Sequence, residues 1–236
     1  MQTKLALLTS TAVAVLALAS PAQASGPFYV SVLGGANFLQ DDSFHAITGP
    51  TVSADTMIFN PNSETGFLVG AAVGMHVDQI IPGLRVEAEV DYRSNHSKGT
   101  WQTNVGNPAN VSSGALDFDH TTWSVLANAW YDFSLGSSLK PYIGGGVGWG
   151  ETKLDGNFVT GDTQHFSFTN DGFAWQVGAG VNFAVSSNVS IGVGYRYFSG
   201  PDVAVSGPGA LGFGNTAVGK INSDSQSVLL SATFNL

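Results

Sequence analysis

The chain has 236 residues, of which 17 are acidic and 8 are Lys or Arg, so its formal net charge is −9. A domain this acidic does not suit nucleic-acid binding, which needs a basic surface. The chain has no Cys, so an exported domain must hold together without disulfides. With 30 Gly, 15 Phe and 11% charged residues it resembles neither a disordered tail nor an ordinary soluble domain, which carries about 25% charge.

The first 24 residues have the three-part layout of a secretory signal peptide. Lys4 precedes an apolar run over 5–18, and a small residue, Ala24, ends the segment. The run is short for a membrane anchor, which needs about 20 residues. We therefore predict a signal peptide of the Sec type over 1–24 and a single all-β domain over 25–236.

The segment LRVEAEVDYR, at 84–93, alternates strictly between apolar or aromatic and charged side chains. A period of two predicts a β-strand with two unlike faces. Seven further segments alternate in the same way, more weakly: 27–39, 66–77, 120–134, 141–153, 172–183, 188–199 and 227–236.

The connections between these eight segments alternate in length. Three are short, within DQIIPG, LGSSLK and SSN, and four are long, polar and rich in Gly, Asn, Ser and Asp: 40–65, 94–118, 154–171 and 200–224. Short turns at one end and long loops at the other are typical of outer-membrane barrels. We therefore predict an all-β fold, an eight-stranded antiparallel up-and-down transmembrane β-barrel with four long extracellular loops.

The charged side chains decide which face of the barrel meets lipid. Arg85 or Arg93 would cost about 2 to 4 kcal/mol each at the bilayer midplane. A soluble barrel of the lipocalin type would instead show its polar face to water. The other seven strands would then expose aromatic and aliphatic residues with too little chain left to cover them. The apolar face is therefore predicted to meet lipid, and the charges to face the lumen.

Aromatic residues on the predicted lipid-facing side fall at two levels, as expected for belts at the two membrane interfaces. The outer belt comprises Phe38, Phe67, Tyr92, Trp123, Trp149, Phe173, Trp175, Tyr195 and Tyr197, and the inner belt comprises Phe28, Phe133, Phe183 and Phe234. The alternative is that these residues are core aromatics of a β-sandwich.

Five segments resemble the small Gram-negative outer-membrane β-barrel proteins: RVEAEVDYR (85–93), SVLANAWYDF (124–133), LKPYIGGGVGWG (139–150), FAWQVGAGVNF (173–183) and VSIGVGYRYF (189–198). This group includes the OmpA-type transmembrane domain and the porin-family surface antigens of alphaproteobacteria and rickettsiae. The resemblance implies an integral outer-membrane location, with membrane lipid, lipopolysaccharide and the barrel-insertion machinery as partners. The family's insertion signal would fall on Phe234 and Leu236, where Leu236 replaces the usual terminal aromatic residue.

Seven charged residues would share the lumen: Arg85, Glu87, Glu89, Asp91, Arg93, Asp132 and Arg196. We predict a structural ion-pair network that plugs the barrel, because charges that avoid lipid must be paired and hydrogen-bonded inside. Strand 188–199 lies roughly opposite strand 84–93, so Arg196 is expected to reach a carboxylate across the lumen. The alternative is a substrate or proton pathway.

The stretch GGVGWGET, at 145–152, has the glycine spacing of a phosphate-binding loop. Such a loop needs Lys where this sequence has Glu151, and a helix after its last glycine. We instead expect Gly144, Gly146 and Gly148 to face the lumen. Glycine inside a small barrel leaves room for bulky groups from the opposite wall, such as the Arg and Glu side chains of strand 84–93.

Enzymatic and porin-like functions find little support. Eight strands enclose a space that side chains fill, so an open channel is not expected. Lipid A-modifying barrels need a Ser activated by a His-based partner. No such motif is present, and the five His residues are scattered, four in or beside the long loops and one inward near the periplasmic end: His45, His96, His120, His165 and His76. We expect no enzyme and no catalytic, cofactor or metal site.

Twelve acidic residues lie in or beside the long loops, against Lys98, Lys153 and Lys220. Such charge is typical of a solvated face, although carboxylates could also bind the divalent cations that bridge lipopolysaccharide phosphates. We predict a monomeric barrel with a structural and surface-exposed role, adhesin-like or antigen-like, whose loops meet a host or environmental ligand. A narrow or gated porin-like channel for small solutes is the alternative, and a lipid A-modifying enzyme is the third hypothesis.

Overall fold

The computed structural model of the protein describes residues 26–40, 44–48, 56–102, 113–136, 138–160, 162–208 and 216–236. Their regular structure consists of β-strands. No helix in this part of the chain is long and apolar enough to span a bilayer. The predicted signal peptide lies outside the described residues.

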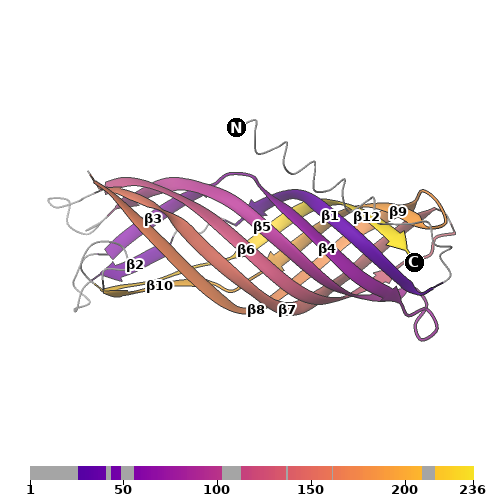
Figure 1. The fold of residues 1–236 in the computed structure, drawn as a ribbon. Helices are drawn as coiled ribbons and strands as arrows, with labels where there is room; N and C mark the ends of the chain where they lie inside the picture. The colour runs from indigo at the N-terminus through magenta and orange to yellow at the C-terminus, as the bar shows by residue number, and fades with distance from the viewer. Residues whose placement is uncertain are drawn as a thin grey trace.

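Eight strands form a closed ring (Figure 1). Each pairs antiparallel with the next, and β1 closes the ring by pairing with both β4 and β12. The predicted fold class is therefore confirmed. The strands are β1 (Phe28–Leu39), β4 (Gly66–His76), β5 (Leu84–Gln102), β6 (Ser113–Asp132), β7 (Leu139–Thr160), β8 (Asp162–Ala184), β9 (Val189–Ser199) and β12 (Asp224–Asn235).

The extent of the predicted loops was wrong. Segments 94–118 and 154–171 are mainly strand, because the β5–β6 ladder continues as far as Gln102 opposite Ser113, and the β7–β8 ladder as far as Thr160 opposite Asp162. The polar, glycine-rich composition of these segments suggested loops. It instead marks strands whose outward faces meet water rather than lipid.

The other two predicted loops contain four short strands, β2 (Phe44–Thr48), β3 (Thr56–Ser63), β10 (Val203–Pro208) and β11 (Thr216–Ile221). The strand β3 pairs with the last residues of β5, β2 with β3, β11 with β2, and β10 with β11. We call these four strands, together with the ends of β5 to β8 that lie beyond the outer aromatic belt, the upper storey.

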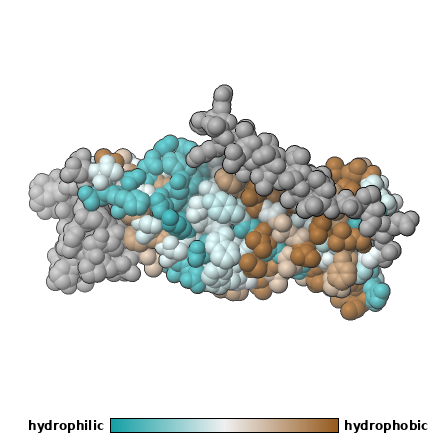
Figure 2. Space-filling model, in the orientation of Figure 1, coloured by the Kyte–Doolittle hydropathy of each residue, from teal (hydrophilic) through white to brown (hydrophobic). Residues whose placement is uncertain are grey.

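The two parts of the barrel have opposite polarity. In the part next to the short turns, apolar side chains face outward; Val90, Ile143 and Leu230 are more than half exposed. Figure 2 shows hydrophobic residues gathered over this part and hydrophilic residues over the upper storey. Inside the upper storey the pattern reverses, and apolar residues form a buried core: Phe59, Trp101, Leu116, Phe118, Leu154, Phe166 and Val203.

Two short turns at the opposite end contain glycines in the left-handed region, Gly83 at φ 86° and Gly136 at φ 68°. Side chains rarely adopt this conformation, which explains the glycines. The amide of Gly83 also donates to Asp78 Oδ1 at 2.7 Å. These turns set the register of the hairpins that carry the lumen residues.

Candidate functional site: the filled lumen and the upper storey

The strand β5 carries the inward charges. Arg85, Glu87, Glu89, Asp91 and Arg93 are all buried, whereas the residues between them face outward. This arrangement follows from the period of two along a strand with one lipid-facing side. The predicted set of lumen residues therefore lies on one inner wall, within reach of partners on β1, β6, β8 and β9.

At the turn end of the lumen, Arg85 and Glu87 have several partners. The Nε atom of Arg85 donates to Asp132 Oδ2 at 3.0 Å and to Oδ1 at 3.2 Å. Glu87 accepts from Trp130 Nε1 at 2.6 Å and from the Tyr29 hydroxyl at 2.8 Å. Arg85 Nη1 lies 3.5 Å from Glu87 Oε2. These contacts connect β1, β5 and β6 across the barrel interior.

The middle of the lumen is organised around Glu89, which is fully buried. Arg196, from β9, forms an ion pair with it. Glu89 also accepts hydrogen bonds from Asn128 Nδ2 at 3.1 Å and from Gln176 Nε2 at 3.3 Å. The Arg196 guanidinium lies 5.0 Å from the Trp130 ring centre, close enough for a cation–π contact. Arg196 thus reaches a carboxylate across the lumen.

Nearer the upper storey, Asp91 and Arg93 form an ion pair. The Ser124 hydroxyl donates to Asp91 Oδ1 at 2.9 Å and accepts from Arg93 at 3.3 Å. The Arg93 guanidinium stacks on Phe198, 3.6 Å from the ring centre. Phe198 packs with Leu126, so an apolar layer covers this end of the polar network.

The seven predicted lumen residues are thus brought together, Asp132 half-buried at the mouth and the other six buried. They comprise three arginines and four carboxylates, and each contacts an opposite charge. A cavity of about 20 Å³ lies among Arg85, Glu87 and Arg196, and one of about 80 Å³ lies at the mouth beside His76 and Lys140. One water needs roughly 10 to 15 Å³ of such space, so these cavities hold only a few waters.

The glycines of β7 make room for β6. A Cβ on Gly144 would lie 2.7 Å from Trp130 Cε3, and one on Gly146 would collide with the Asn128 side chain. These glycines face the lumen as expected, but the side chains that need the space were predicted wrongly. They belong to the neighbouring strand rather than to the Arg and Glu residues of β5. A large residue at Gly146 would displace Asn128 from the network.

The residues predicted as aromatic belts lie on the outward face. Nine are 38% to 65% exposed and four are half-buried: Phe28, Phe38, Tyr92, Trp123, Phe133, Trp149, Phe173, Phe183 and Tyr195 in the first group, and Phe67, Trp175, Tyr197 and Phe234 in the second. Phe234 lies between Val30 and Val189 in the sheet, and Leu236 is 46% exposed at the chain end.

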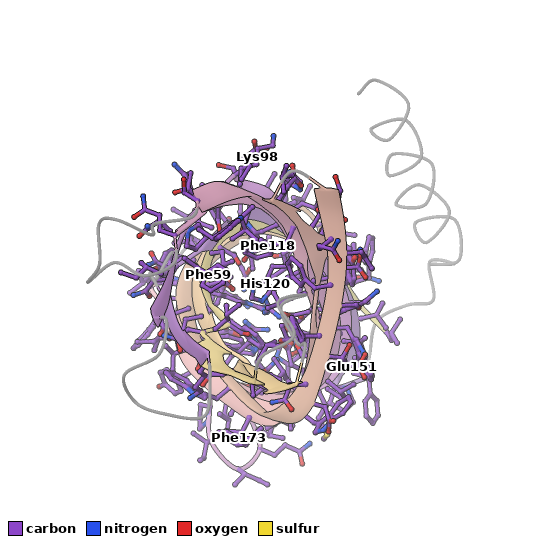
Figure 3. The ribbon with its side chains drawn as sticks, turned by 90° about the vertical axis from the view of Figure 1, so that its left-hand side faces the viewer. Phe59, Lys98, Phe118, His120, Glu151 and Phe173 are labelled. Atoms are coloured by element: carbon purple, nitrogen blue, oxygen red, sulfur yellow. The ribbon has the colours of Figure 1, made fainter. Side chains whose placement is uncertain are left out.

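Carboxylates accompany the outer belt. Trp123 Nε1 donates to Glu151 at 3.2 Å, and Trp149 Nε1 donates to Asp171 at 3.2 Å. Figure 3 shows Glu151 and Phe173 on the outside of the ring. The indole N–H groups are therefore satisfied by the protein itself at the level where the lipid-facing surface ends.

Each Lys of the upper storey pairs with a carboxylate. Lys98 lies 3.0 Å from Glu64 and lowers the pKa of that carboxyl, and Lys153 lies 2.6 Å from Asp155 and lowers its pKa. Lys220 pairs with Asp202. Exposed pairs of this kind contribute little stability. The three pairs neutralise only three carboxylates, so the outer face of the upper storey keeps an excess of negative charge.

His120 is a residue that the sequence interpretation missed. It was placed beside a long loop, at the first residue of the predicted strand 120–134, yet it is 3% exposed on the inner face of β6, beside Asn95 and Leu154 in the sheet. Neither ring nitrogen has a hydrogen-bond partner among the described residues, and burial lowers the pKa of His120 to about 4. The alternation of DFDHTTW, which places His120 on the same face as Phe118, was the available signal (Figure 3).

The other histidines lie apart. His76 lines the mouth cavity, and His96 contacts Asp119 at 2.8 Å on the outer face. His165 lies 3.9 Å from Asp155, and the side chain of His45 lies outside the described residues. Within the described chain no three His, Asp or Glu residues are placed to hold a metal ion.

A closed eight-stranded ring with an apolar outward face and charged residues in its lumen defines an integral outer-membrane β-barrel. The chain belongs to the family described as the outer membrane protein beta-barrel domain, whose model matches residues 6–226. The protein is therefore an integral protein of the bacterial outer membrane, in contact with its lipids.

The chain is also similar to individual outer-membrane proteins, at low sequence identity or over part of its length. The chain is 33% identical over 84 residues to the outer membrane protein PagN of Salmonella typhimurium; the match covers 34% of this chain and about a third (35%) of the length of PagN. OprG of Pseudomonas aeruginosa has the same fold, with a TM-score of 0.54 at 13% identity over 89% of this chain and 98% of OprG. Neisserial surface protein A gives a TM-score of 0.49 at 22% identity, over 89% and 97% of the two chains.

Proposed function

We propose that the protein is a structural barrel that displays an adhesin-like or antigen-like surface outside the cell. The observation that carries this proposal is the set of ion pairs across the lumen, together with strands that continue far beyond Trp123. A barrel built to conduct has no use for a plugged interior, whereas a display scaffold gains rigidity from one.

The height of the upper storey supports display. Ser113 lies ten residues beyond Trp123 along β6, which is about 33 Å of strand at the usual rise. At a strand tilt of about 40° this corresponds to roughly 25 Å above the belt. The upper storey has its own apolar core, so the last described residues of β5 and β6, Gln102 and Ser113, are held well clear of the lipid surface.

The interior contacts argue against the porin-like alternative. An ion would have to pass Arg85 and Glu87, then Glu89 and Arg196, and finally the apolar layer at Phe198. Each ion pair would have to separate in a low-dielectric interior, where uncompensated charge is costly. The network is better suited to stabilising the barrel than to transport.

Adhesion of whole cells tests the display function. A non-adherent Gram-negative strain expressing the protein should bind cultured host cells or extracellular matrix more than the empty strain. Replacing residues 103–112, which connect β5 to β6 in the sequence, with a short turn should reduce this binding, while the barrel remains folded and heat-resistant. Equal adhesion with and without the protein, at proven surface exposure, would contradict the proposal.

A further inference from the structure

The wall of the upper storey contains a seam between β8 and β10. Among the described residues, β8 pairs with β9 only from Trp175 to Ala184, and from 162 to 174 its ladder runs to β7 alone. The described ladder of β10 runs to β11 alone. In a strand every second residue directs its N–H and C=O groups to the same side, so β8 presents such groups along the seam.

The hairpin of β10 and β11 lies beside this edge, anchored by buried Val203 in the apolar core. On one side β11 is paired with β2 at Ala217 and Val218. On the other side the Asn170 side chain donates to the Asp202 carbonyl at 2.7 Å. Below that point buried Pro201 packs near Gly172 and closes the seam. The unladdered edge of β8 therefore lies over residues 163–169.

The side chains of this edge alternate clearly. His165, Ser167 and Thr169 are exposed, whereas Phe166 and Phe168 pack in or against the buried core. The edge carries neither Lys nor Pro, the residues with which proteins commonly protect an exposed strand edge. An added strand with alternating apolar and polar residues would match both sides of this sheet.

We propose that the edge of β8 over residues 163–169 is a docking site for an extended segment of a partner protein outside the cell. The segment adds to the sheet as an antiparallel strand, in the place that β10 leaves unladdered. Main-chain hydrogen bonds supply the affinity, and alternate side chains supply the specificity, as in other cases of strand addition. This inference rests on the proposed display function and names the chemistry of its partner.

A second copy of this chain does not fit the site. Barrel strands tilt by about 35 to 45° in outer-membrane proteins. Two barrels with parallel axes in one membrane have the same handedness, so their facing strands cross at twice the tilt, roughly 70 to 90°. Strands crossing at that angle cannot form a ladder, whereas a segment of a separate protein can align freely.

The charges beside the seam indicate which segment fits. Asp171 is exposed at the lower end of the edge, and its indole partner Trp149 leaves its negative charge in place. Asp155 on β7 is paired with Lys153. An antiparallel partner begins next to Asp171, so basic residues at its N-terminal end are favoured there and acidic ones are disfavoured.

Hydrogen exchange of the refolded full-length mature protein tests the seam itself. Every second amide over 163–169 should exchange at least tenfold faster than amides over 153–157 of β7, which pair with both β6 and β8. Slow exchange of all amides over 163–169 would mean that a complete ladder already covers this edge. That result would overturn the proposal.

A synthetic peptide probe tests docking. It consists of alternating Val and Thr over eight residues, preceded by two Lys, and its binding is followed by fluorescence anisotropy. Methylation of alternate backbone amides should weaken binding at least tenfold, and exchanging Lys for Glu should weaken it as well. Binding that methylation does not change, or no binding at all, would overturn the proposal.

A pair of matched variants connects docking with display. Thr169→Lys places a charge on the open edge, and Asn157→Lys places one opposite His165 on β7, which is paired on both sides. Only Thr169→Lys should reduce peptide binding, by at least tenfold. If cells adhere through the protein but Thr169→Lys changes neither adhesion nor peptide binding, the docking site is wrong and the display function stands. If the peptide binds but cells do not adhere through the protein, the docking site stands and the display function is wrong.

Discussion

Acidification should loosen the upper storey through His120. This side chain is buried beside the apolar core without a hydrogen-bond partner among the described residues, and burial lowers its pKa from 6.5 to about 4. When the upper storey opens, the imidazole regains an ordinary pKa. The open state therefore binds the proton more tightly, and stability falls as the pH drops through 6.5 and levels off below about 4.

The magnitude follows from these two pKa values. The difference between the two pKa values of His120 lowers the stability of the closed upper storey by at most about 3 kcal/mol, at 1.36 kcal/mol per pKa unit. At pH 5 the opening equilibrium should be favoured roughly 30-fold over pH 7.5, or about 2 kcal/mol. Burial is the cause of this shift, so salt should change it little.

Trp101 offers a local probe, because it is 1% exposed in the same core. Hydrogen exchange of its indole N–H and of nearby amides can be followed from pH 7.5 to pH 4.5 in detergent micelles, with intrinsic exchange rates corrected for pH. His120→Leu should abolish the pH dependence, and His165→Leu, an exposed control, should retain it. A pH dependence of equal size in His120→Leu, or an upper storey that tightens in acid, would refute the reasoning.

Three further substitutions test the remaining contacts. Arg196→Ala leaves Glu89 as a buried unpaired charge, so the barrel should lose about 3 to 5 kcal/mol of stability, visible as reduced heat resistance in a gel-shift assay; unchanged heat resistance would remove the main support for the network. Gly146→Leu should displace Asn128 and lower the yield of folded barrel, whereas a normal yield would mean that this glycine does not face the lumen. Lys98→Ala removes an exposed pair and should change the free energy of unfolding by less than about 1 kcal/mol; a larger loss in urea titration would contradict the assignment of these pairs as surface contacts.

The sequence was sufficient for the membrane-spanning part because one physical rule governs it. A lipid-facing strand must alternate, and the alternation at 84–93 assigns both faces of β5 without knowledge of its neighbours. The lumen partners are harder to predict. Arg196 was expected to reach a carboxylate, but only the register shows that the carboxylate is Glu89 and that Gln176 and Asn128 complete its coordination.

The upper storey was missed for a related reason. Beyond the outer belt water replaces lipid, so the outward residues become polar and the inward ones apolar. The alternation persists in DFDHTTW, but its polarity is reversed. When the composition of such a segment is averaged over both faces, the segment reads only as polar. The predicted strand therefore began only at His120, and its burial was not recognised. The seam beside β8 could not be predicted at all, since it depends on how the β10–β11 hairpin pairs.

Single-channel recording on the refolded protein in a planar bilayer tests the central claim, a barrel whose lumen is filled. The ion pairs from Arg85 to Arg93 and the apolar layer at Phe198 predict no steady conductance at either polarity. The folded state of the refolded protein must be verified independently, by its heat-modifiable mobility on a gel. A steady, large conductance from pure, folded protein would contradict the filled lumen and favour the channel alternative.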